Sequence, residues 1–189
     1  GFHDSVKEIM KQSTRGVLRG IHGPVSQLLS AEADYALAIE TALGAAAQNI
    51  VIDSQNDGRL AIEMLQRSDA GRATFLPMSA IRPQTLNANA RSVLKMPGCI
   101  GVASELVQCA PEYRGIIENL LGRTVVVEDL DCGIAMARKY QNRFRIVTLD
   151  GQVINRGGSM TGGSVNKEAG ILSRANELEK LVKQQTQLH

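Results

Sequence analysis

Residues 20–44 read GIHGPVSQLLSAEADYALAIETALG, and residues 98–122 read GCIGVASELVQCAPEYRGIIENLLG. The two segments align at an offset of 78 without a gap, and nine of their 25 positions are identical. The likeness continues downstream, where residues 50–52 (IVI) correspond to residues 125–127 (VVV). A repeat of this length indicates a supersecondary unit that occurs twice. We therefore expect two related subdomains that arose by internal duplication.

Each copy combines helix and strand patterns. The runs IVI and VVV are continuous apolar segments, which are typical of strands buried on both faces. Ile39 and Leu43 recur at helical spacing, as do Ile117 and Leu121 in the second copy. The sequence therefore predicts an α/β fold of the mixed α+β kind. The expected division is subdomain I at 16–80, a linker at 81–97 that contains Pro83, and subdomain II at 98–166.

Both ends of the chain carry short amphipathic helix patterns, at residues 1–15 and 167–189. The stripe residues are Phe2, Val6, Ile9 and Met10 at the first end, and Leu178, Leu181 and Leu188 at the second. Helices this short are marginal in water on their own. They either pack on the core or pair with each other antiparallel, as terminal coiled-coil helices. The chain opens with Gly1 and ends inside a helical pattern, which favours coiled-coil arms that continue in a longer protein.

Residues 151–164 (GQVINRGGSMTGGS) form a glycine-rich segment that matches neither common nucleotide-binding loop. A Walker A loop needs a lysine directly after its last glycine, and here the next lysine is Lys167. The spacing also differs from G-x-G-x-x-G. Without a phosphate to bind, the glycines are explained either by positive φ angles or by the close approach of another backbone. We interpret the segment, with a strand edge beside it, as a dimer interface. The expected interface residues are Val153, Ile154, Gly157, Gly158, Gly162 and Gly163.

Nucleic-acid binding would need a local basic patch, because the net charge is only +2. Lys and Arg are in excess between residues 138 and 156, with Tyr140 and Phe144 between them. This excess indicates either a phosphate-binding patch or a solvated helix face. The candidate DNA contacts are Arg138, Lys139, Arg143 and Arg145, joined by Lys180 and Lys183 of the second terminal helix.

Other chemistry finds no support in the sequence. Cys99, Cys109 and Cys132 lie far apart and are interpreted as reduced thiols of a cytoplasmic protein rather than metal ligands. No Ser/His/Asp arrangement or pair of carboxylates indicates catalysis, and no apolar run approaches the roughly 20 residues that span a membrane. We expect no catalytic residues, no metal and no cofactor in this fragment, and no membrane association.

Four longer motifs carry a family resemblance. They are ALGAAAQNIVID at 42–53, GRATFLP at 71–77, LLGRTVVVEDLDCGIAMARK at 120–139 and TLDGQVINRGGSMTGGS at 148–164. In this order they resemble the hinge domain of the structural maintenance of chromosomes (SMC) proteins, especially the bacterial members. The resemblance covers about residues 16–166. The segment His22-Gly23-Pro24 departs from the usual pattern of the family, and the departure is confined to this turn.

The resemblance implies a ring-shaped homodimer with the glycine-rich segment at its interface. It also implies one coiled-coil arm ending in 1–15, a second beginning in 167–189, and antiparallel pairing between them. The arms of such proteins lead to a distant ATP-binding ATPase head, which is absent here. The implied setting is chromosome condensation and segregation at the nucleoid, in the cytoplasm. The implied function is a homodimerisation module that contributes weak, non-specific DNA binding; the alternative is a stand-alone nucleic-acid-binding module.

The glycine-rich segment gives the first prediction: the chain binds neither ATP nor GTP. The segment has no lysine for the phosphates and no following Ser or Thr to hold Mg²⁺. Isothermal titration calorimetry should show no heat of binding with either nucleotide. Stoichiometric binding at micromolar concentration would contradict this interpretation.

Overall fold

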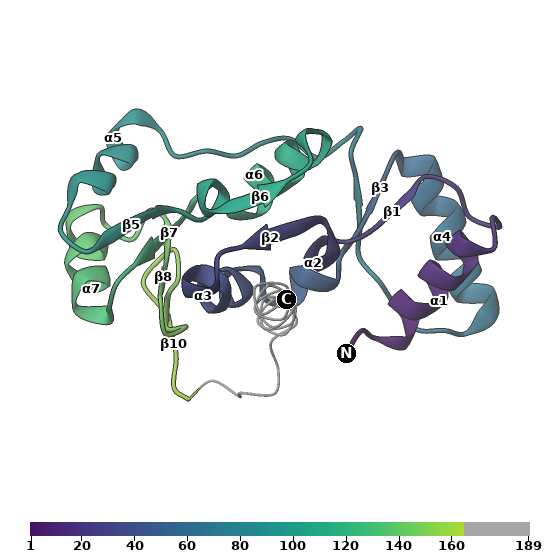
Figure 1. The fold of residues 1–189 in the computed structure, drawn as a ribbon, viewed down its shortest axis with the longest axis horizontal. Coiled ribbons are helices and arrows are strands. Elements are labelled where there is room, and N and C mark those ends of the chain that lie inside the picture. Colours follow the sequence, from purple (N-terminus) through teal and green to yellow (C-terminus); the bar gives the residue numbers. More distant parts are fainter. Residues whose placement is uncertain (165–189) are drawn as a thin grey trace, which may run out of the picture.

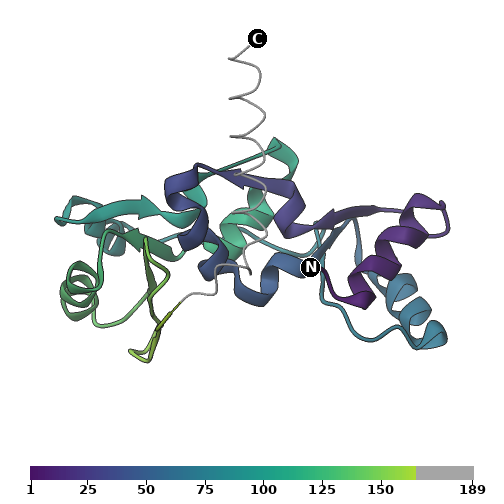
Figure 2. The ribbon, with the colours of Figure 1, turned by 60° about the horizontal axis from the view of Figure 1, so that its bottom comes forward.

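The computed structural model describes residues 1–164. The predicted outgoing arm at 167–189, with Lys180 and Lys183, therefore lies outside the described residues. The described part is elongated, with α1 (Asp4–Thr14) and α4 (Gln55–Ser68) at one end and α5 (Ala88–Arg91) and α7 (Leu130–Lys139) at the other (Figure 1). Figure 2 shows the same long axis from another side.

The two predicted copies have the same order of elements: strand, short helix, strand, helix, strand, helix, strand. In the first copy these are β1 (Ile21–Pro24), α2 (Val25–Leu28), β2 (Leu29–Ala31), α3 (Ala33–Leu43), β3 (Ile50–Ile52), α4 and β4 (Phe75–Pro77). In the second they are β5 (Cys99–Val102), η3 (Ala103–Leu106), β6 (Val107–Cys109), α6 (Arg114–Leu121), β7 (Thr124–Val127), α7 and β8 (Arg145–Thr148). The mixed α/β fold class is confirmed.

The strand pairing is also equivalent in the two copies. β3 lies between β1, which is antiparallel to it, and β4, which is parallel. β7 lies in the same way between β5 and β8. The register shifts between Ile21 and Gly23 in the first sheet and between Cys99 and Gly101 in the second. This irregularity therefore falls at corresponding residues of the repeat, 78 positions apart.

The copies meet through β2 and β6, which pair antiparallel with each other. Ser30 lies opposite Gln108 in this pairing, and these residues are separated by the repeat offset. The pairing is therefore symmetrical about its central residues. Side chains from both copies form one central apolar cluster around it, including Ile39, Ile117 and Leu121.

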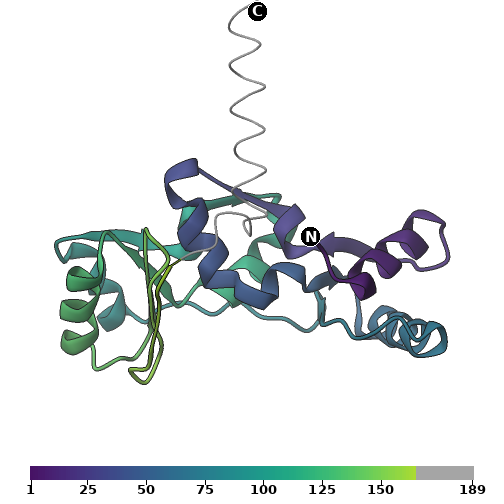
Figure 3. The ribbon, with the colours of Figure 1, turned by 90° about the horizontal axis from the view of Figure 1, so that it is seen from below.

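Each end of the molecule has its own smaller cluster. At one end Val6 and Ile9 of α1 are buried in a cluster with Ile50, Met64 and Leu65. Figure 3 shows α1 and α4 side by side. The apolar stripe of residues 1–15, which we expected to pair with an outgoing arm, is thus buried on subdomain I. Burial of this stripe removes apolar surface that a free arm would leave in water.

The segment between the copies is more than a linker. It contains α5 and the 3-10 helix η2 (Ser92–Lys95), and Ala90 and Val93 are buried in the second outer cluster. Asn87 caps α5, because its side chain accepts a hydrogen bond of 2.8 Å from the Ala90 N–H. Residues 81–97, expected as a connection with few apolar runs, therefore contribute to the core of subdomain II.

Gly44 and Gly122 end corresponding helices for different reasons. Gly44 has a φ of +53°, and no atom of residues 1–164 lies within 4 Å of an added Cβ. Gly122 has an ordinary φ of −71°, but an added Cβ would overlap the backbone carbonyl oxygen of Gln84. The second glycine is therefore required because residues 81–97 cross closely over the end of α6.

This difference predicts unequal effects of alanine at the two positions. Gly44→Ala should cost about 1–2 kcal/mol of the free energy of unfolding through backbone strain alone. Gly122→Ala should cost about 3 kcal/mol through overpacking and should also displace the crossing segment. Urea unfolding measures the first effect, and hydrogen exchange at the Gln84 amide measures the second. Slow exchange at Gln84 in Gly122→Ala, equal to that in Gly44→Ala, would contradict the steric explanation.

Candidate self-association edges and basic groove

The glycine-rich segment folds into a hairpin of β9 (Val153–Ile154) and β10 (Met160–Thr161). β9 pairs with β8 on one side and β10 on the other, and its two side chains are each only 3% exposed. The expected exposed strand edge at Val153 and Ile154 is therefore wrong. The edge of the sheet on this side is β10, where the Met160 side chain is 55% exposed. Figure 2 shows the yellow-green hairpin projecting from subdomain II.

The four clustered glycines have reasons within the chain itself. Gly157 and Gly158 form the turn of the hairpin with φ angles of +90° and +106°, which other residues rarely adopt. An added Cβ at Gly162 would overlap the side-chain amide of Gln152. That amide accepts a 2.8 Å hydrogen bond from the Gly163 N–H and donates one of 3.0 Å to the Gly163 carbonyl. A second chain is therefore not needed to explain these glycines, contrary to the sequence argument.

Comparison of the two copies reveals another open edge. β8 has neighbours on both sides, whereas β4 pairs only with β3 among residues 1–164. A groove of about 530 Å³ lies beside β4 and α4, and its apolar lining includes Gly58, Ile62, Phe75 and Pro77. Within this lining the apolar side chain of Ile62 is 48% exposed.

In subdomain II the equivalent space is filled by β9. Gly133 corresponds to Gly58, and an added Cβ at Gly133 would lie 3.4 Å from Cδ1 of Ile154. At Gly58 the only atom of the described residues within 4 Å of such a Cβ is Cδ1 of Ile52, which belongs to the sheet beneath. Ala137, the counterpart of Ile62, is only 6% exposed. The groove beside β4 thus lies where β9 lies in subdomain II, and no strand within residues 1–164 occupies it.

The predicted basic patch divides into two parts. Arg138, Lys139 and Arg143 are exposed. Arg145 points inward: its guanidinium donates a 2.6 Å hydrogen bond to the Ala42 carbonyl, and burial lowers its pKa. Arg145 therefore connects β8 of subdomain II to the end of α3 in subdomain I, so its half-buried guanidinium has a structural contact within the chain.

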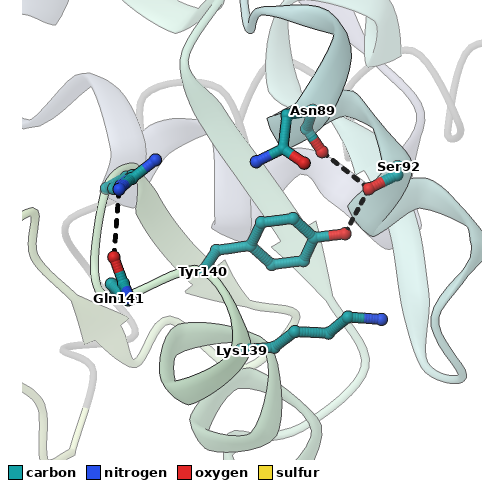
Figure 4. Close-up of a pocket in the computed structure, with 6 residues that line it drawn as sticks. Asn89, Ser92, Lys139, Tyr140 and Gln141 are labelled. Atoms are coloured by element: carbon teal, nitrogen blue, oxygen red, sulfur yellow. Dashed lines mark hydrogen bonds between the residues drawn. The ribbon is translucent and has the colours of Figure 1, made fainter.

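The two aromatic residues of that patch are also unavailable for stacking. Tyr140 is 7% exposed and Phe144 is 3% exposed, and both belong to the apolar cluster beneath α7. The Tyr140 hydroxyl forms a 2.5 Å hydrogen bond with Oγ of Ser92, which ties α7 to η2 (Figure 4). Their role is therefore packing within subdomain II.

Two adjoining hollows lie beside the hydrogen bond between Tyr140 and Ser92. Their volumes are about 300 and 370 Å³, and both are lined by Asn89, Tyr140 and Arg143. We call them together the basic groove, because its charged lining residues are all cations, namely Arg123, Lys139, Arg143 and Arg156. The sequence analysis missed Arg123, which is more than ten residues from the rest of the patch and joins it only through the fold.

The described residues offer little for catalysis or metal binding. No group of three or more His, Cys, Asp or Glu side chains within residues 1–164 could hold a metal ion. The three cysteines are free, and burial raises the pKa of Cys99. Within the same part of the chain, no helix is long and apolar enough to cross a bilayer.

A histidine contact crosses between the subdomains. Nε2 of His22 lies 2.6 Å from Oδ1 of Asp53, and Nδ1 lies 2.8 Å from the Tyr113 hydroxyl. Tyr113 itself packs against the central cluster, as does Tyr35 at the corresponding place in the first copy. No Ser, Thr or Cys takes part in these hydrogen bonds, so the arrangement does not resemble a nucleophile with its base.

Comparisons with known proteins agree with these features. The family model described as "SMC proteins Flexible Hinge Domain" matches residues 18–137. The chromosome partition protein Smc of Bacillus subtilis is 46% identical over 185 residues, and that of Halothermothrix orenii is 40% identical over the same length. These alignments cover 97% of this chain but 15% of each relative. The chain therefore spans a small part of the relatives it matches.

Solved structures show the same fold. An asymmetric dimer of the Geobacillus stearothermophilus SMC hinge domain superposes with a TM-score of 0.90 at 42% identity, covering 99% of this chain and 75% of that one. The Pyrococcus furiosus Smc hinge domain with an extended coiled coil gives a TM-score of 0.71 at 26% identity, covering 93% of this chain and 62% of that one.

The position of Arg145 predicts a structural role. Arg145→Ala should lower the free energy of unfolding by about 2 kcal/mol, because the Ala42 carbonyl loses a charged hydrogen-bond donor. The matched variant Arg138→Ala removes an exposed cation nearby and should change stability by less than about 0.5 kcal/mol. Urea unfolding of both variants checks this, and equal stability of the two would contradict the assignment.

Proposed function

The chain belongs to the family of SMC flexible hinge domains, and on that premise we propose that it is the homodimerisation module of a chromosome partition protein. In this proposal it joins the two coiled-coil arms of a longer protein that acts on chromosomes in the cytoplasm, at the nucleoid. ATP hydrolysis belongs to a head region elsewhere in such a protein, and the hinge itself is not an enzyme. The alignment covers 15% of the length of the Bacillus subtilis relative, which agrees with one module of a longer protein.

The observation that carries the proposal is the pair of open strand edges. β4 in subdomain I has an apolar groove beside it, and β10 in subdomain II exposes Met160. Unpaired edges of this kind promote uncontrolled association unless a partner covers them. The solved structure of an asymmetric hinge dimer from Geobacillus stearothermophilus, at 42% identity, supports a partner of the same kind.

A two-fold symmetric dimer would give both β4 and β10 a partner strand. If subdomain I of each copy meets subdomain II of the other, β10 of one copy lies beside β4 of its partner, and the contact occurs twice. Such an assembly closes on itself and leaves neither edge open. Met160 would then occupy the groove beside β4, in the position that Ile154 takes over Gly133 within subdomain II. We expect the interface to exceed about 1,000 Å² in total.

Pairing of the two arms is also part of the proposal, with one constraint from the fold. The apolar stripe of α1 is already buried on subdomain I. Pairing with residues 167–189 would therefore use the polar side of α1, for example Lys7 and Lys11. The Pyrococcus furiosus hinge structure, whose coiled coil is extended, supports the presence of arms.

Weak DNA binding without sequence preference is the second part of the proposed function. The exposed cations Arg138, Lys139 and Arg143 support it, whereas Arg145 does not. Binding that depends on phosphate contacts weakens steeply with salt. A stand-alone nucleic-acid module remains the alternative, and it would not need the open edges of β4 and β10.

Charge placed in the groove beside β4 should prevent dimerisation. Ile62→Glu and, on the opposite edge, Met160→Glu should each shift the chain from dimer to monomer, because a carboxylate would lose its hydration in an apolar contact. Leu60→Glu is the matched control: Leu60 is 42% exposed on the same helix but does not line the groove. Sedimentation velocity at tens of micromolar measures all four proteins.

A monomeric wild-type chain at that concentration would refute dimerisation as the function. A dimer that persists in both groove variants would refute the pairing of β4 with β10. Replacement of Gly162 and Gly163 by Glu is a poorer test, since both changes also disturb the contacts of Gln152 within the hairpin.

A further inference from the structure

We propose that His22 fixes the angle between the two subdomains. It lies on β1 of subdomain I and contacts Tyr113, the last residue of the 3-10 helix η4 (Pro111–Tyr113) in subdomain II. We call this contact, together with the hydrogen bond between His22 and Asp53, the His22 bridge. By fixing the angle, the bridge prepares the edges of β4 and β10 for a partner, and this consequence alone rests on the proposed function.

A β-bulge turns His22 out of its strand. Ile21 and Gly23 pair with adjacent residues of β3, so His22 is the extra residue between two pairs. A bulge bends its strand and redirects the side chains beside it. Gly23 follows with a φ of +131°, which residues other than glycine rarely adopt. The backbone of β1 therefore aims the imidazole ring away from its own sheet, toward subdomain II.

The ring of His22 is held on two sides. Nε2 lies 2.6 Å from Oδ1 of Asp53 in subdomain I, and Nδ1 lies 2.8 Å from the Tyr113 hydroxyl in subdomain II. The rings of His22 and Tyr113 also meet edge to face, with centroids 5.4 Å apart and planes at 82°. The ring cannot rotate without breaking a hydrogen bond, and one of these bonds joins the two subdomains.

The central strand pair alone would allow the angle between the subdomains to vary. β2 and β6 contain three residues each, and among residues 1–164 they pair only with each other. The twist between paired strands ranges from about −10 to −35°. Because the described part is elongated, a small change of twist at its centre moves the outer ends far (Figure 1). Directional contacts beside the strand pair are therefore needed to place the ends precisely.

The second copy of the repeat lacks such a bridge. Ile100 corresponds to His22 and is the extra residue of the equivalent bulge, and Tyr35 corresponds to Tyr113. Both are partly buried against the central cluster. The Tyr35 hydroxyl has no hydrogen-bond partner within residues 1–164. An apolar residue can slide over its neighbours, whereas hydrogen bonds restrict direction. The His22 side of the joint thus sets the angle.

A fixed angle matters for a dimer with two equivalent contacts. β4 and β10 belong to different subdomains, and in the proposed dimer both must meet a partner strand at once. When the angle is fixed, formation of the first contact places the second pair of edges together, which raises their effective concentration. A loose joint would have to be ordered on binding, at a cost in affinity. Loss of the His22 bridge should therefore weaken the dimer from outside the groove beside β4.

Residual dipolar couplings measure the angle directly. The Ile62→Glu background keeps the chain monomeric, which sedimentation velocity verifies, so that a partner cannot hold the subdomains. With the bridge intact, the amides of residues 16–80 and 98–164 should fit one common alignment tensor. In Tyr113→Phe and in His22→Ile the common tensor should be lost, because the two subdomains then move relative to each other. Amide chemical shifts away from the bridge should stay unchanged and show that both subdomains remain folded.

Tyr35→Phe is the matched control. It removes a hydroxyl at the corresponding place of the other copy, where no hydrogen bond within residues 1–164 is broken. This variant should keep the common tensor. In the chain without Ile62→Glu, Tyr113→Phe should raise the dimer Kd on the order of fivefold, since association must then supply the order that one hydrogen bond supplied before. Tyr35→Phe should leave the dimer Kd unchanged.

The possible results separate this inference from the proposed function. A common tensor that persists in both Tyr113→Phe and His22→Ile would show that the bridge does not set the angle. Separate tensors with an unchanged dimer Kd would refute the preparation of the two edges, although the bridge would still set the angle. If the chain without substitutions is a monomer, dimerisation fails as the function, and the dipolar couplings still decide whether His22 fixes the angle.

Discussion

The antiparallel pairing of β2 with β6 is the contact on which the rest of the structure depends. It places corresponding residues of the repeat opposite each other at Ser30 and Gln108, so the two subdomains face each other symmetrically. One central cluster can then be shared by both copies, which buries apolar surface that neither copy could cover alone. The two sheets lie on either side of this centre, β1 and β3 toward one end of the molecule and β5, β7 and β8 toward the other (Figure 1).

The symmetry of the core makes the differences between the copies informative. Both copies have a central buried strand, a helix over it and a glycine where that helix meets the sheet. Within the described part of the chain, only subdomain II has strands beyond its outer parallel strand, namely β9 and β10. The same scaffold therefore presents a covered strand at one end and an open strand with an apolar groove at the other. An open position in one copy, filled in the other, is what a second molecule of the same chain could use.

The sequence predicted the features that depend on local pattern and on the repeat. The buried strands at 50–52 and 125–127, the helices around Ile39 and Ile117, and the mixed fold all follow from periodicity. Features set by distant neighbours could not be predicted in this way. Ile62 occupies the position of buried Ala137, and it is exposed because no strand of residues 1–164 lies beside β4 as β9 lies beside β8.

The candidate sites depend even more on such neighbours. Gly162 is explained by the side chain of Gln152 across the hairpin, and Arg145 by a carbonyl more than 100 residues earlier. Each had been assigned to an intermolecular role because its partner within the chain was not visible in the sequence. Conversely, Arg123 enters the basic groove only because residues 81–97 fold onto α7. A charged residue or a glycine thus becomes evidence for a binding surface only after its contacts within the chain have been accounted for.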